Sequence, residues 1–338
     1  MRVFNGVSGT SLQSTKALSE SLKKMNNKSK IIIYRENRLL KDLEDYNLNI
    51  DTKNIILYPI YALRIIKLFI NSIKEFDVFH FHSGHSILPN NIDLVFLKIF
   101  KKKVFMEYHG SEIRREAIFN KKNTHGIDIG CLKEEKSYKL QKRISKHVNG
   151  IIVHDMELDE QLFDLRVKKY ELPLRINVNN IKASYPIKKS EIIIVHAPSK
   201  RGKKGTEFLI EAIKNLENNY NIKLILIENV SYKEALKIYE KADIIVDQLL
   251  IGTYGMFSIE AMALGKPVIT YLREDLVASF PNDLPIYNSN IFNIEKDLEL
   301  LIKNPDLRYE IGVKCRKYVE KYHDSDKLAK KAIEIYSE

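Results

Sequence analysis

Residues 242–271 read ADIIVDQLLIGTYGMFSIEAMALGKPVITY, and this stretch decides the fold. The β-branched run Ile244–Val246 predicts a short strand that is buried on both faces. Met256–Leu264 is rich in good helix formers, and Gly265 stands where a helix C′ residue is wanted. Val268–Tyr271 then predicts the next strand. The stretch therefore indicates the order strand, glycine loop, helix, strand.

Polar and glycine residues fill the loop between the first strand and the helix. Asp247 and Gln248 follow the strand, and Gly252–Gly255 contains two glycines, where backbone can approach a ligand closely. A loop that leads into a helix N-terminus offers free N–H groups and a positive dipole end, which suit an anion. Glu260 lies in the first turns of that helix. Its carboxylate cannot bind the anion, but it can hold a sugar hydroxyl attached to it.

The stretch resembles the donor-site signature of the family 4 glycosyltransferases, which have the GT-B fold. That signature is a Glu, any residue, an aromatic, Gly, a second Glu eight residues after the first, and then Ala-x-Ala-x-Gly-x-Pro-Val. Gly252 takes the place of the first Glu. The positions that match are Tyr254, Gly255, Glu260, Ala261, Ala263, Gly265, Pro267 and Val268.

The resemblance implies a donor, a mechanism and a set of roles. In the family the second Glu, here Glu260, binds the nucleotide ribose, and the first helps to hold the transferred sugar. Family 4 enzymes retain the anomeric configuration and use no bound metal, so we expect a nucleotide sugar as substrate and no cofactor. The leaving phosphate is thought to take the acceptor proton, so the resemblance demands no side-chain base.

A second segment, His196–Thr206, points to the same chemistry. It carries four cations in five positions, between a predicted strand at Glu191–Val195 and a predicted helix at 207–216. Such runs are commonly solvated, but open α/β sheets bind ligands where strands end and helices begin. The segment resembles the family's Arg…Lys-Gly run, with a shorter spacing. The resemblance assigns Arg201 and Lys204 to the donor diphosphate.

The beginning of the chain predicts a Rossmann-like unit. Arg2–Val7 predicts a strand, Gly6–Thr10 a turn with two glycines, and Leu12–Met25 a helix. The dinucleotide fingerprint G-x-G-x-x-G is absent here. We include Gly9 and Thr10 among the expected donor-binding residues.

Histidines follow two predicted strands of the N-terminal half. Val104–Tyr108 ends at His109, in a His-Gly-Ser-acid run that resembles the acceptor-facing loop of the family; the alternative is a helix start capped by Ser111. The strand Phe76–His82 contains His80 and His82, and His85 follows. Three close histidines suggest zinc, but no separate carboxylate or cysteine completes a set at metal spacing. We therefore expect no metal site.

Together these motifs give the expected site. The expected catalytic residues are His109, Arg201 and Lys204. The expected donor-binding residues are Gly9, Thr10, Arg201, Lys204, Asp247, Gly252, Thr253, Tyr254, Gly255, Met256, Phe257 and Glu260.

Length and the alternation of strand and helix predict an α/β fold of two Rossmann-like domains that face each other across a cleft, the GT-B architecture. We expect an N-terminal acceptor domain over residues 1–178 and a C-terminal donor domain over 190–320. The Asn- and Lys-rich segment Ile176–Lys189 is the expected linker. Residues 321–338 should form a helix that packs back towards the N-terminal domain.

Composition and charge limit the location and the partners. Hydrophobic residues make up 44% of the chain and charged residues 29%, no apolar run is long enough to span a membrane, and two cysteines fit a reducing compartment. We expect a cytoplasmic protein whose N-terminus is a strand and not a signal peptide. The net charge of +11 suits polyanions, anionic lipid surfaces or phosphorylated ligands.

The predicted helix Pro59–Ile73 is apolar except for one narrow stripe that contains Arg64 and Lys67. It is either a helix packed on the sheet or one that also dips into a lipid interface. The second reading would place the chain peripherally on the inner face of a membrane, with an anionic membrane surface as a partner.

The function expected from these observations is transfer of a sugar from a nucleotide-sugar donor to an acceptor hydroxyl. The acceptor would be a glycan or a lipid-linked molecule, in the synthesis of cell-surface polysaccharide or glycoconjugates. One alternative is a nucleotide-sugar epimerase of the same fold. The other is a non-catalytic nucleic-acid binder, which the charge suggests, but no aromatics are interleaved with the basic runs. We therefore expect no nucleic-acid partner.

Overall fold

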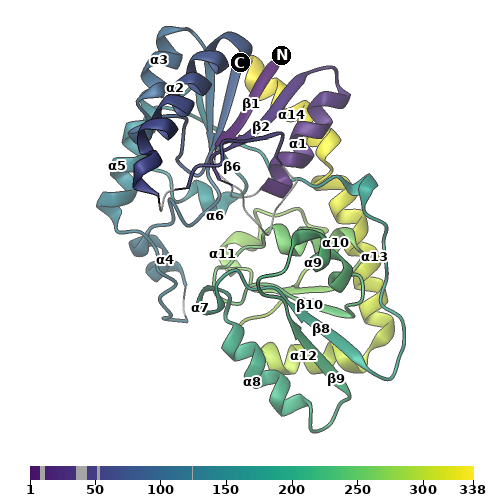
Figure 1. Ribbon diagram of the computed structural model, residues 1–338. Coiled ribbons are helices and arrows are strands. Elements are labelled where there is room, and N and C mark those ends of the chain that lie inside the picture. Colours follow the sequence, from purple (N-terminus) through teal and green to yellow (C-terminus); the bar gives the residue numbers. More distant parts are fainter. Residues whose placement is uncertain (8–11, 36–43, 52–53, 124) are drawn as a thin grey trace. The chain divides into compact units, whose positions relative to one another are not determined.

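The computed structural model describes residues 1–7, 12–35, 44–51, 54–123 and 125–338 (Figure 1). The chain divides into two compact α/β units. Unit 1 consists of Met1–Ile118, Cys131–Arg175 and Ser325–Glu338. Unit 2 consists of Phe119–Gly130 and Ile176–Asp324.

Unit 1 is built on a parallel sheet with the strand order β3-β2-β1-β4-β5-β6-β7. The neighbouring strands of this order pair in parallel throughout the described chain. The central strands are short runs of β-branched and aromatic residues that are buried on both faces, as parallel sheets require. The strands are β1 (Arg2–Val7), β2 (Lys28–Ile33), β3 (Tyr46–Asn47), β4 (Val78–His82), β5 (Lys103–Glu107), β6 (Gly150–Val153) and β7 (Lys168–Glu171).

The helices that follow these strands pack on the sheet. The C-terminal helix α14 belongs to unit 1, where Leu328, Ala332 and Tyr336 pack against Val3 and Leu18, and Figure 1 shows it beside α1. The helices of this part of the chain are α1 (Leu12–Lys24), α2 (Tyr58–Glu75), α3 (Asp93–Ile99), α4 (Glu116–Lys122), α5 (Glu134–Ser145), α6 (Met156–Asp159) and α14 (Ser325–Ser337).

One local prediction and one local alternative in unit 1 are wrong. The short apolar run at 55–58 predicts a strand before the helix at 59–73, but it is a 3-10 turn, η2 (Ile55–Leu57), that runs directly into α2. Its short apolar run fits either element by periodicity, and Pro59 in the first turn of α2 favours the helix. Ser111 does not cap a helix, because residues 111–113 form turns and α4 begins only at Glu116.

Unit 2 has a smaller parallel sheet with the strand order β12-β11-β10-β8-β9. Its strands are β8 (Ile192–His196), β9 (Ile222–Leu226), β10 (Ile244–Val246), β11 (Val268–Thr270) and β12 (Tyr287–Asn288). Its helices are α7 (Arg201–Lys204), α8 (Thr206–Leu216), α9 (Tyr232–Tyr239), α10 (Met256–Ala263), α11 (Glu274–Val277), α12 (Ile294–Lys303) and α13 (Pro305–Tyr322). The expected linker residues are irregular apart from the short 3-10 turn η4 (Val178–Asn180).

The stretch that decided the fold has the predicted order: β10, loop, α10, β11. Gly265 has a φ of +73°, the left-handed conformation expected just after a helix. A Cβ at this position would lie 2.5 Å from the ring of Tyr185, so glycine is also required by packing.

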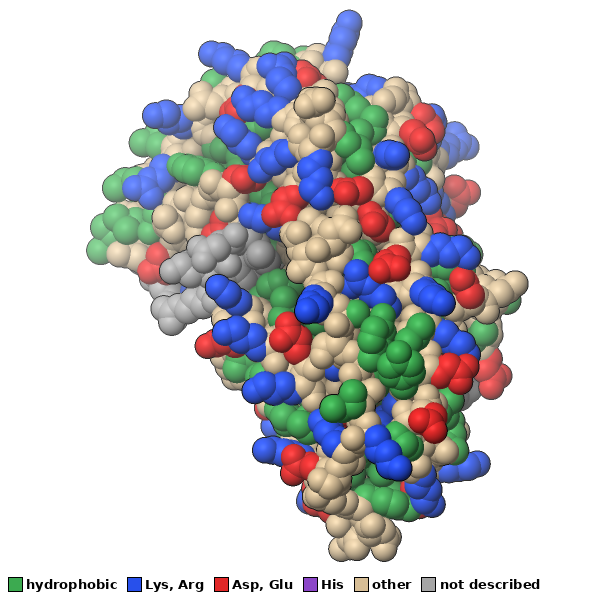
Figure 2. Space-filling view, turned by 90° about the vertical axis from the view of Figure 1, so that its right-hand side faces the viewer, with side chains coloured by type: hydrophobic (Ala, Val, Ile, Leu, Met, Phe, Trp, Pro, Cys, Tyr) green, Lys and Arg blue, Asp and Glu red, His purple; other side chains and the backbone are tan. Residues whose placement is uncertain are grey.

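On the face drawn in Figure 2, Lys and Arg side chains are interspersed with Asp and Glu. Among the described residues, no helix is both long and apolar enough to cross a membrane.

Candidate functional site

The two segments that resemble the donor signature meet at the carboxyl edge of the unit 2 sheet. β8 and β10 are neighbours, with His196 in register with Val246, so the loops after both strands begin side by side. Nζ of Lys204 lies 2.7 Å from Oδ1 of Asp247 and 2.7 Å from Oε1 of Gln248. Open α/β sheets bind ligands at this edge.

Asp247 is a charged anchor for this edge. It is buried, and Ser258 Oγ donates a hydrogen bond to Oδ2 over 2.7 Å. Burial alone would raise the pKa of Asp247, but the Lys204 ammonium and these hydrogen bonds outweigh it and lower the pKa. The carboxylate therefore orients Lys204, one of the residues expected to contact phosphate.

Arg201 does not join the Lys204 cluster in the structure. The four residues Arg201–Lys204 form the short helix α7 and not the expected loop. The exposed guanidinium of Arg201 donates to both oxygens of Glu228 over 3.0 and 2.7 Å, and these contacts raise its pKa. An incoming phosphate would have to compete with Glu228 for this side chain.

The glycine loop leads directly into α10. Gly252 has a φ of +95°, and a Cβ there would lie 3.2 Å from three side-chain carbons of Arg273. Gln248 Nε2 donates to the carbonyl of Thr253. α10 begins at Met256 after Gly255, which has no side chain to cap it, so its first-turn N–H groups are offered at this edge.

Two aromatic residues of the predicted site have packing roles. The hydroxyl of Tyr254 lies 3.1 Å from the hydroxyl of Tyr318 and 3.1 Å from Nε2 of His323, so it binds the end of α13. The ring of Phe257 contacts that of Tyr239, with centroids 4.9 Å apart.

Glu260 is the group at this edge with an unused acceptor. Its side chain is 3% exposed, and Oε1 has no hydrogen-bond partner among the residues that the structure describes. Burial raises the pKa of Glu260 to about 8, against the opposing effect of a hydrogen bond with Tyr232. A buried carboxyl oxygen without a partner is costly, and a ligand hydroxyl would satisfy it.

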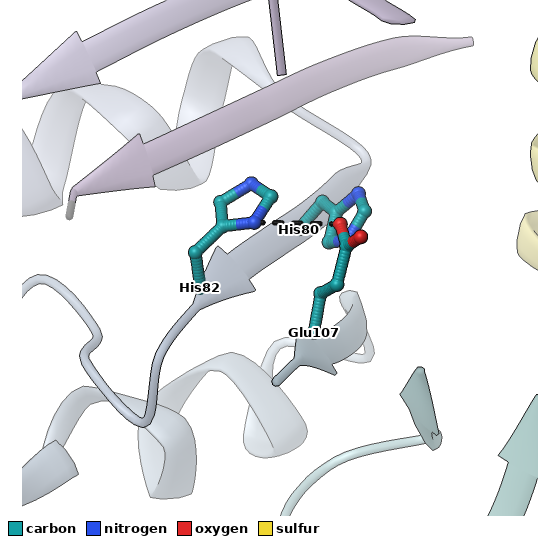
Figure 3. Close-up of side chains that lie close together, drawn as sticks. All are labelled: His80, His82 and Glu107. Carbon is teal, nitrogen blue, oxygen red and sulfur yellow. Dashed lines mark ion pairs between the residues drawn. The ribbon is translucent and has the colours of Figure 1, made fainter. Parts of the chain in front are cut away.

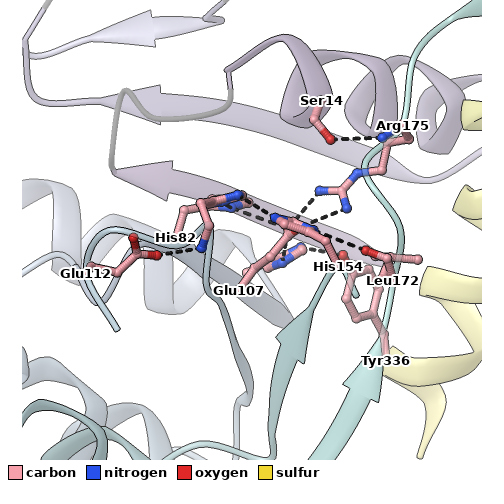
Figure 4. Close-up of polar contacts among 10 residues, drawn as sticks. Ser14, His82, Glu107, Glu112, His154, Leu172, Arg175 and Tyr336 are labelled. Atoms are coloured by element: carbon pink, nitrogen blue, oxygen red, sulfur yellow. Dashed lines mark hydrogen bonds and ion pairs between the residues drawn. The ribbon is translucent and has the colours of Figure 1, made fainter. Parts of the chain in front are cut away.

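Unit 1 carries a second polar cluster, which contains His82, Glu107 and His154 (Figure 4). His109 joins this cluster through His82 and His154. Both ring nitrogens of His109 are engaged: Nδ1 lies 2.8 Å from Nε2 of His154, and Nε2 lies 3.1 Å from Nδ1 of His82. Burial, followed by the neighbouring His154, lowers the pKa of His109 to about 3. The ring is therefore neutral near pH 7 and fixed by its histidine neighbours.

Glu107 and Arg175 form the centre of this cluster. Both are 0% exposed, and the guanidinium donates to the two carboxylate oxygens over 2.8 and 2.7 Å. Although burial favours the protonated acid, Arg175 and His80 hold the pKa of Glu107 well below its usual range. Sequence reasoning missed Glu107 and Arg175, and a buried acid at the end of β5 was the available signal.

Contrary to the sequence expectation, a carboxylate does lie at metal spacing from the histidines, namely that of Glu107. His80, His82 and Glu107 present ligand atoms within 4.8 Å of one another (Figure 3). Glu107, His109 and His154 do the same, whereas His85 is exposed and belongs to neither group. Arg175 already neutralises both oxygens of the shared carboxylate, so a metal would have to displace it. These residues therefore do not fit a metal while that ion pair is intact.

A cavity of about 640 Å³ opens in unit 1 beside the loops after β4 and β5. Its walls combine the partly buried acid Glu112 with three cations of α5, namely Lys136, Lys139 and Arg143. Burial raises the pKa of Glu112. A larger cavity of about 1000 Å³ lies beside β2, β3 and α2, but it is remote from these loops, and its Lys28 and Lys30 pair with Glu75.

Two expected donor-binding residues, Gly9 and Thr10, lie outside the described residues.

Comparison with known proteins gives a limited sequence match. No family model matches the chain. Over 185 residues, 46% of this chain, it is 22% identical to an uncharacterized glycosyltransferase of Methanocaldococcus jannaschii. The matched part spans about half of that protein, 47% of its length.

Solved structures match over the whole chain. Sucrose-phosphate synthase of Thermosynechococcus elongatus has a TM-score of 0.70 at 13% identity, covering 100% of this chain and 98% of that one. Anabaena HepE in complex with UDP and glucose has a TM-score of 0.70 at 10% identity, covering 99% and 98%. A glycosyltransferase from Rickettsia africae has a TM-score of 0.65 at 15% identity, covering 99% and 97%.

At these identities the likeness concerns the fold. The expected α/β class is confirmed: the chain has two Rossmann-like domains, each with a parallel sheet, as in solved GT-B glycosyltransferases.

Proposed function

We propose that the chain is a glycosyltransferase that moves a sugar from a nucleotide-sugar donor to an acceptor hydroxyl, with unit 2 as the donor domain. The observation that carries the proposal is Glu260, a buried carboxyl with one oxygen unpartnered in the described chain. It lies on α10, whose N-terminus offers amides to an anion. A nucleoside diphosphate carries both of the matching groups, a ribose hydroxyl and phosphates.

Lys204 and the first turn of α10 supply the chemistry of the leaving group. Cleavage of the bond between sugar and diphosphate increases the charge on the phosphate oxygens. The Lys204 ammonium, held by Asp247, and the amides of Met256 and Phe257 stabilise that charge. Arg201 would add a second cation if its guanidinium left Glu228 and bound the phosphate instead.

The finer parts of the proposal rest on the family 4 resemblance. We propose retention of the anomeric configuration, with the leaving phosphate taking the acceptor proton and no metal or cofactor required. His109 is proposed to line the acceptor side. The acceptor is proposed to be a glycan or a lipid-linked molecule of cell-surface polysaccharide or glycoconjugate synthesis, and the proposed location is the cytoplasm.

Structural neighbours suggest which donor to test first. HepE is solved with UDP-glucose, at a TM-score of 0.66 and 10% identity. Staphylococcus aureus TarM is solved with UDP and α-GlcNAc-glycerol, at a TM-score of 0.56 and 16% identity. We therefore propose uridine diphosphate sugars as the first donors to screen.

The test is titration calorimetry of the chain with uridine, UDP and UDP-glucose, followed by the variant Glu260→Gln. Because the pKa of Glu260 is about 8, the titration is run at pH 9, where the carboxylate is ionised. A charged hydrogen bond contributes about 1.5–3 kcal/mol, so we expect the variant to bind uridine and UDP about ten- to a hundredfold more weakly at that pH. Glu211→Gln, an exposed change on α8 of the same unit, is the matched control.

A turnover assay with UDP-glucose, with and without an acceptor extract, distinguishes the alternatives. An epimerase converts the sugar of the donor without any acceptor, whereas a glycosyltransferase releases UDP when an acceptor extract is added. A nucleic-acid binder does neither. Unchanged binding of every nucleotide by Glu260→Gln would remove the main support for the proposal.

A further inference from the structure

Helices α2 and α3 of unit 1 together present an apolar surface that no described residue of unit 1 covers. The two helices lie side by side (Figure 1), and the rings of Phe69 and Phe96 contact each other with centroids 6.1 Å apart. The most exposed apolar side chains of these two helices are Leu63 at 68% and Ile99 at 66%. We call this surface the α2–α3 face; its exposed residues are Ile60, Leu63, Ile66, Ile70, Ile92, Val95, Phe96, Ile99 and Phe100.

The inner side of α2 already satisfies the packing needs of unit 1. Tyr61 and Phe69 are buried in the core, and Ile65 and Leu68 pack against it. The exposed residues Leu63, Ile66 and Ile70 therefore contribute nothing to that core. Contiguous exposed apolar surface on a folded unit commonly marks an interaction site.

Charge identifies the kind of partner. Residues 58–75 and 92–103 contain seven cations and only two carboxylates. Glu75 is taken by Lys28 and Lys30, and Asp93 is buried and accepts hydrogen bonds from Ser86 and the amide of Ile87. The seven cations are Arg64, Lys67, Lys74, Lys98, Lys101, Lys102 and Lys103. Lys98, Lys102 and Lys103 donate hydrogen bonds to backbone carbonyls, which are neutral and leave their charges uncompensated.

We propose that the α2–α3 face docks on an anionic lipid bilayer. Apolar side chains of a surface helix enter the boundary between headgroups and acyl chains, while flanking Lys and Arg bind anionic headgroups. The face carries both elements on two adjacent helices. This combination favours peripheral attachment of unit 1 by its own helices.

A second copy of the chain fits the face less well. A two-fold interface brings the same patch of each copy together, so the cations of one copy would face those of the other. An anionic surface would instead attract these cations, and a neutral partner would leave their charge uncompensated.

The proposal also bears on the acceptor, and this part rests on the proposed function. Ile65 of α2 lines the cavity of about 640 Å³, whose α5 wall carries Lys136 and Arg143. Docking by α2 places the cavity next to the lipid headgroups. The acceptor class that suits this arrangement is a lipid-linked molecule with an anionic group near the membrane surface.

The test is co-sedimentation of the full chain with vesicles of phosphatidylcholine alone or of phosphatidylcholine and phosphatidylglycerol in equal parts. We expect sedimentation with the anionic vesicles only, and its loss as salt rises. Leu63→Ser with Ile99→Ser should abolish it. Lys67→Gln with Lys101→Gln should weaken it about twenty-fivefold, because each exposed cation is worth about fivefold near such a surface.

Matched controls come from unit 2. Ile187 and Phe292 are 69% and 74% exposed, and their replacement by Ser should leave vesicle binding unchanged, as should Lys237→Gln with Lys241→Gln. UDP titration of every variant separates this proposal from the proposed function, since the docking variants should bind UDP like the unmodified chain.

Two results would overturn the proposal. One is no sedimentation with anionic vesicles at low salt. The other is a dimer in analytical ultracentrifugation without vesicles that Leu63→Ser with Ile99→Ser converts to a monomer, which would assign the face to a second copy.

Discussion

Nζ of Lys204 lies 2.7 Å from Oδ1 of Asp247, and this ion pair joins the two loops at the carboxyl edge of the unit 2 sheet. The side chain of Lys204 is 14% exposed and that of Asp247 is 1% exposed. Lys204 therefore has a fixed direction before any ligand arrives, which lowers the entropy cost of using it on a phosphate.

We predict that Lys204→Ala lowers UDP affinity about ten- to a hundredfold while uridine affinity stays nearly unchanged, because a charged hydrogen bond contributes about 1.5–3 kcal/mol. The variant also leaves buried Asp247 without its cation, so the melting temperature should fall. Calorimetry below the melting temperature of the variant measures the two affinities. Lys203→Ala is the control. If Lys204→Ala weakens uridine binding as much as UDP binding, the phosphate contact lies elsewhere.

The raised pKa of Glu260, about 8 against 4.5, predicts a pH dependence of stability. Between these values the unfolded chain has lost this proton and the folded chain keeps it, so stability falls as pH rises through the window. The slope from this group is at most about 1.4 kcal/mol per pH unit. Glu260→Gln should remove this slope, which is measured by denaturant unfolding of both proteins from pH 5 to 9. If the free energy of unfolding depends on pH in the same way in both proteins, Glu260 is ionised in the folded state.

The buried histidines predict an opposite slope at acid pH. The pKa of His109 is lowered to about 3 and that of His154 to about 4, in both cases chiefly by burial. As pH falls below 6.5, the unfolded chain binds these protons and the folded chain does not, so stability is lost. His154→Gln should make the acid loss shallower in the same unfolding experiment. His85→Gln, an exposed change, should leave it unchanged.

The Glu107–Arg175 pair predicts a strong non-additivity. Glu107→Gln leaves a buried guanidinium without its carboxylate, which should cost about 3–5 kcal/mol. Arg175→Met should cost a similar amount, and the double variant less than the two single changes together. Urea unfolding of the three proteins measures this coupling; additive losses would show that the pair does not act as a unit.

His109→Ala separates an acceptor role from a structural one. Transfer should slow strongly while UDP affinity stays near that of the unmodified chain. His82→Gln is the comparison variant, because His82 is the hydrogen-bonded neighbour of His109 in the same cluster. If both variants lose stability equally and transfer slows only in proportion to the folded fraction, His109 acts through the fold.

Gly252 cannot accept the missing glutamate freely. Its φ of +95° and the side chain of Arg273 at 3.2 Å make Gly252→Glu strained. We expect Gly252→Glu to lower the melting temperature. Gly202→Ala should leave it unchanged, because the new Cβ meets nothing within 4 Å. An unchanged melting temperature would show that the loop rearranges at low cost.

Local sequence patterns predicted much of the fold. Ile244–Val246 is a strand, the helix after it ends before Gly265, and β1 has its predicted bounds. These elements could be predicted because apolar periodicity and capping residues act within a few positions of the chain. The same patterns are ambiguous for a short apolar run, which is why Ile55–Leu57 was expected to be a strand.

By itself, the sequence determined the order of strands and helices, the glycine loop and the charged segment before α8, because these depend on neighbours along the chain. Only the tertiary structure decided which side chains meet. Glu107 and Arg175 are 68 positions apart and pair only because β5 ends beside the segment that leaves β7. Likewise, burial leaves Oε1 of Glu260 without a partner in the described chain, and burial is a property of the packed domain that no local pattern carries.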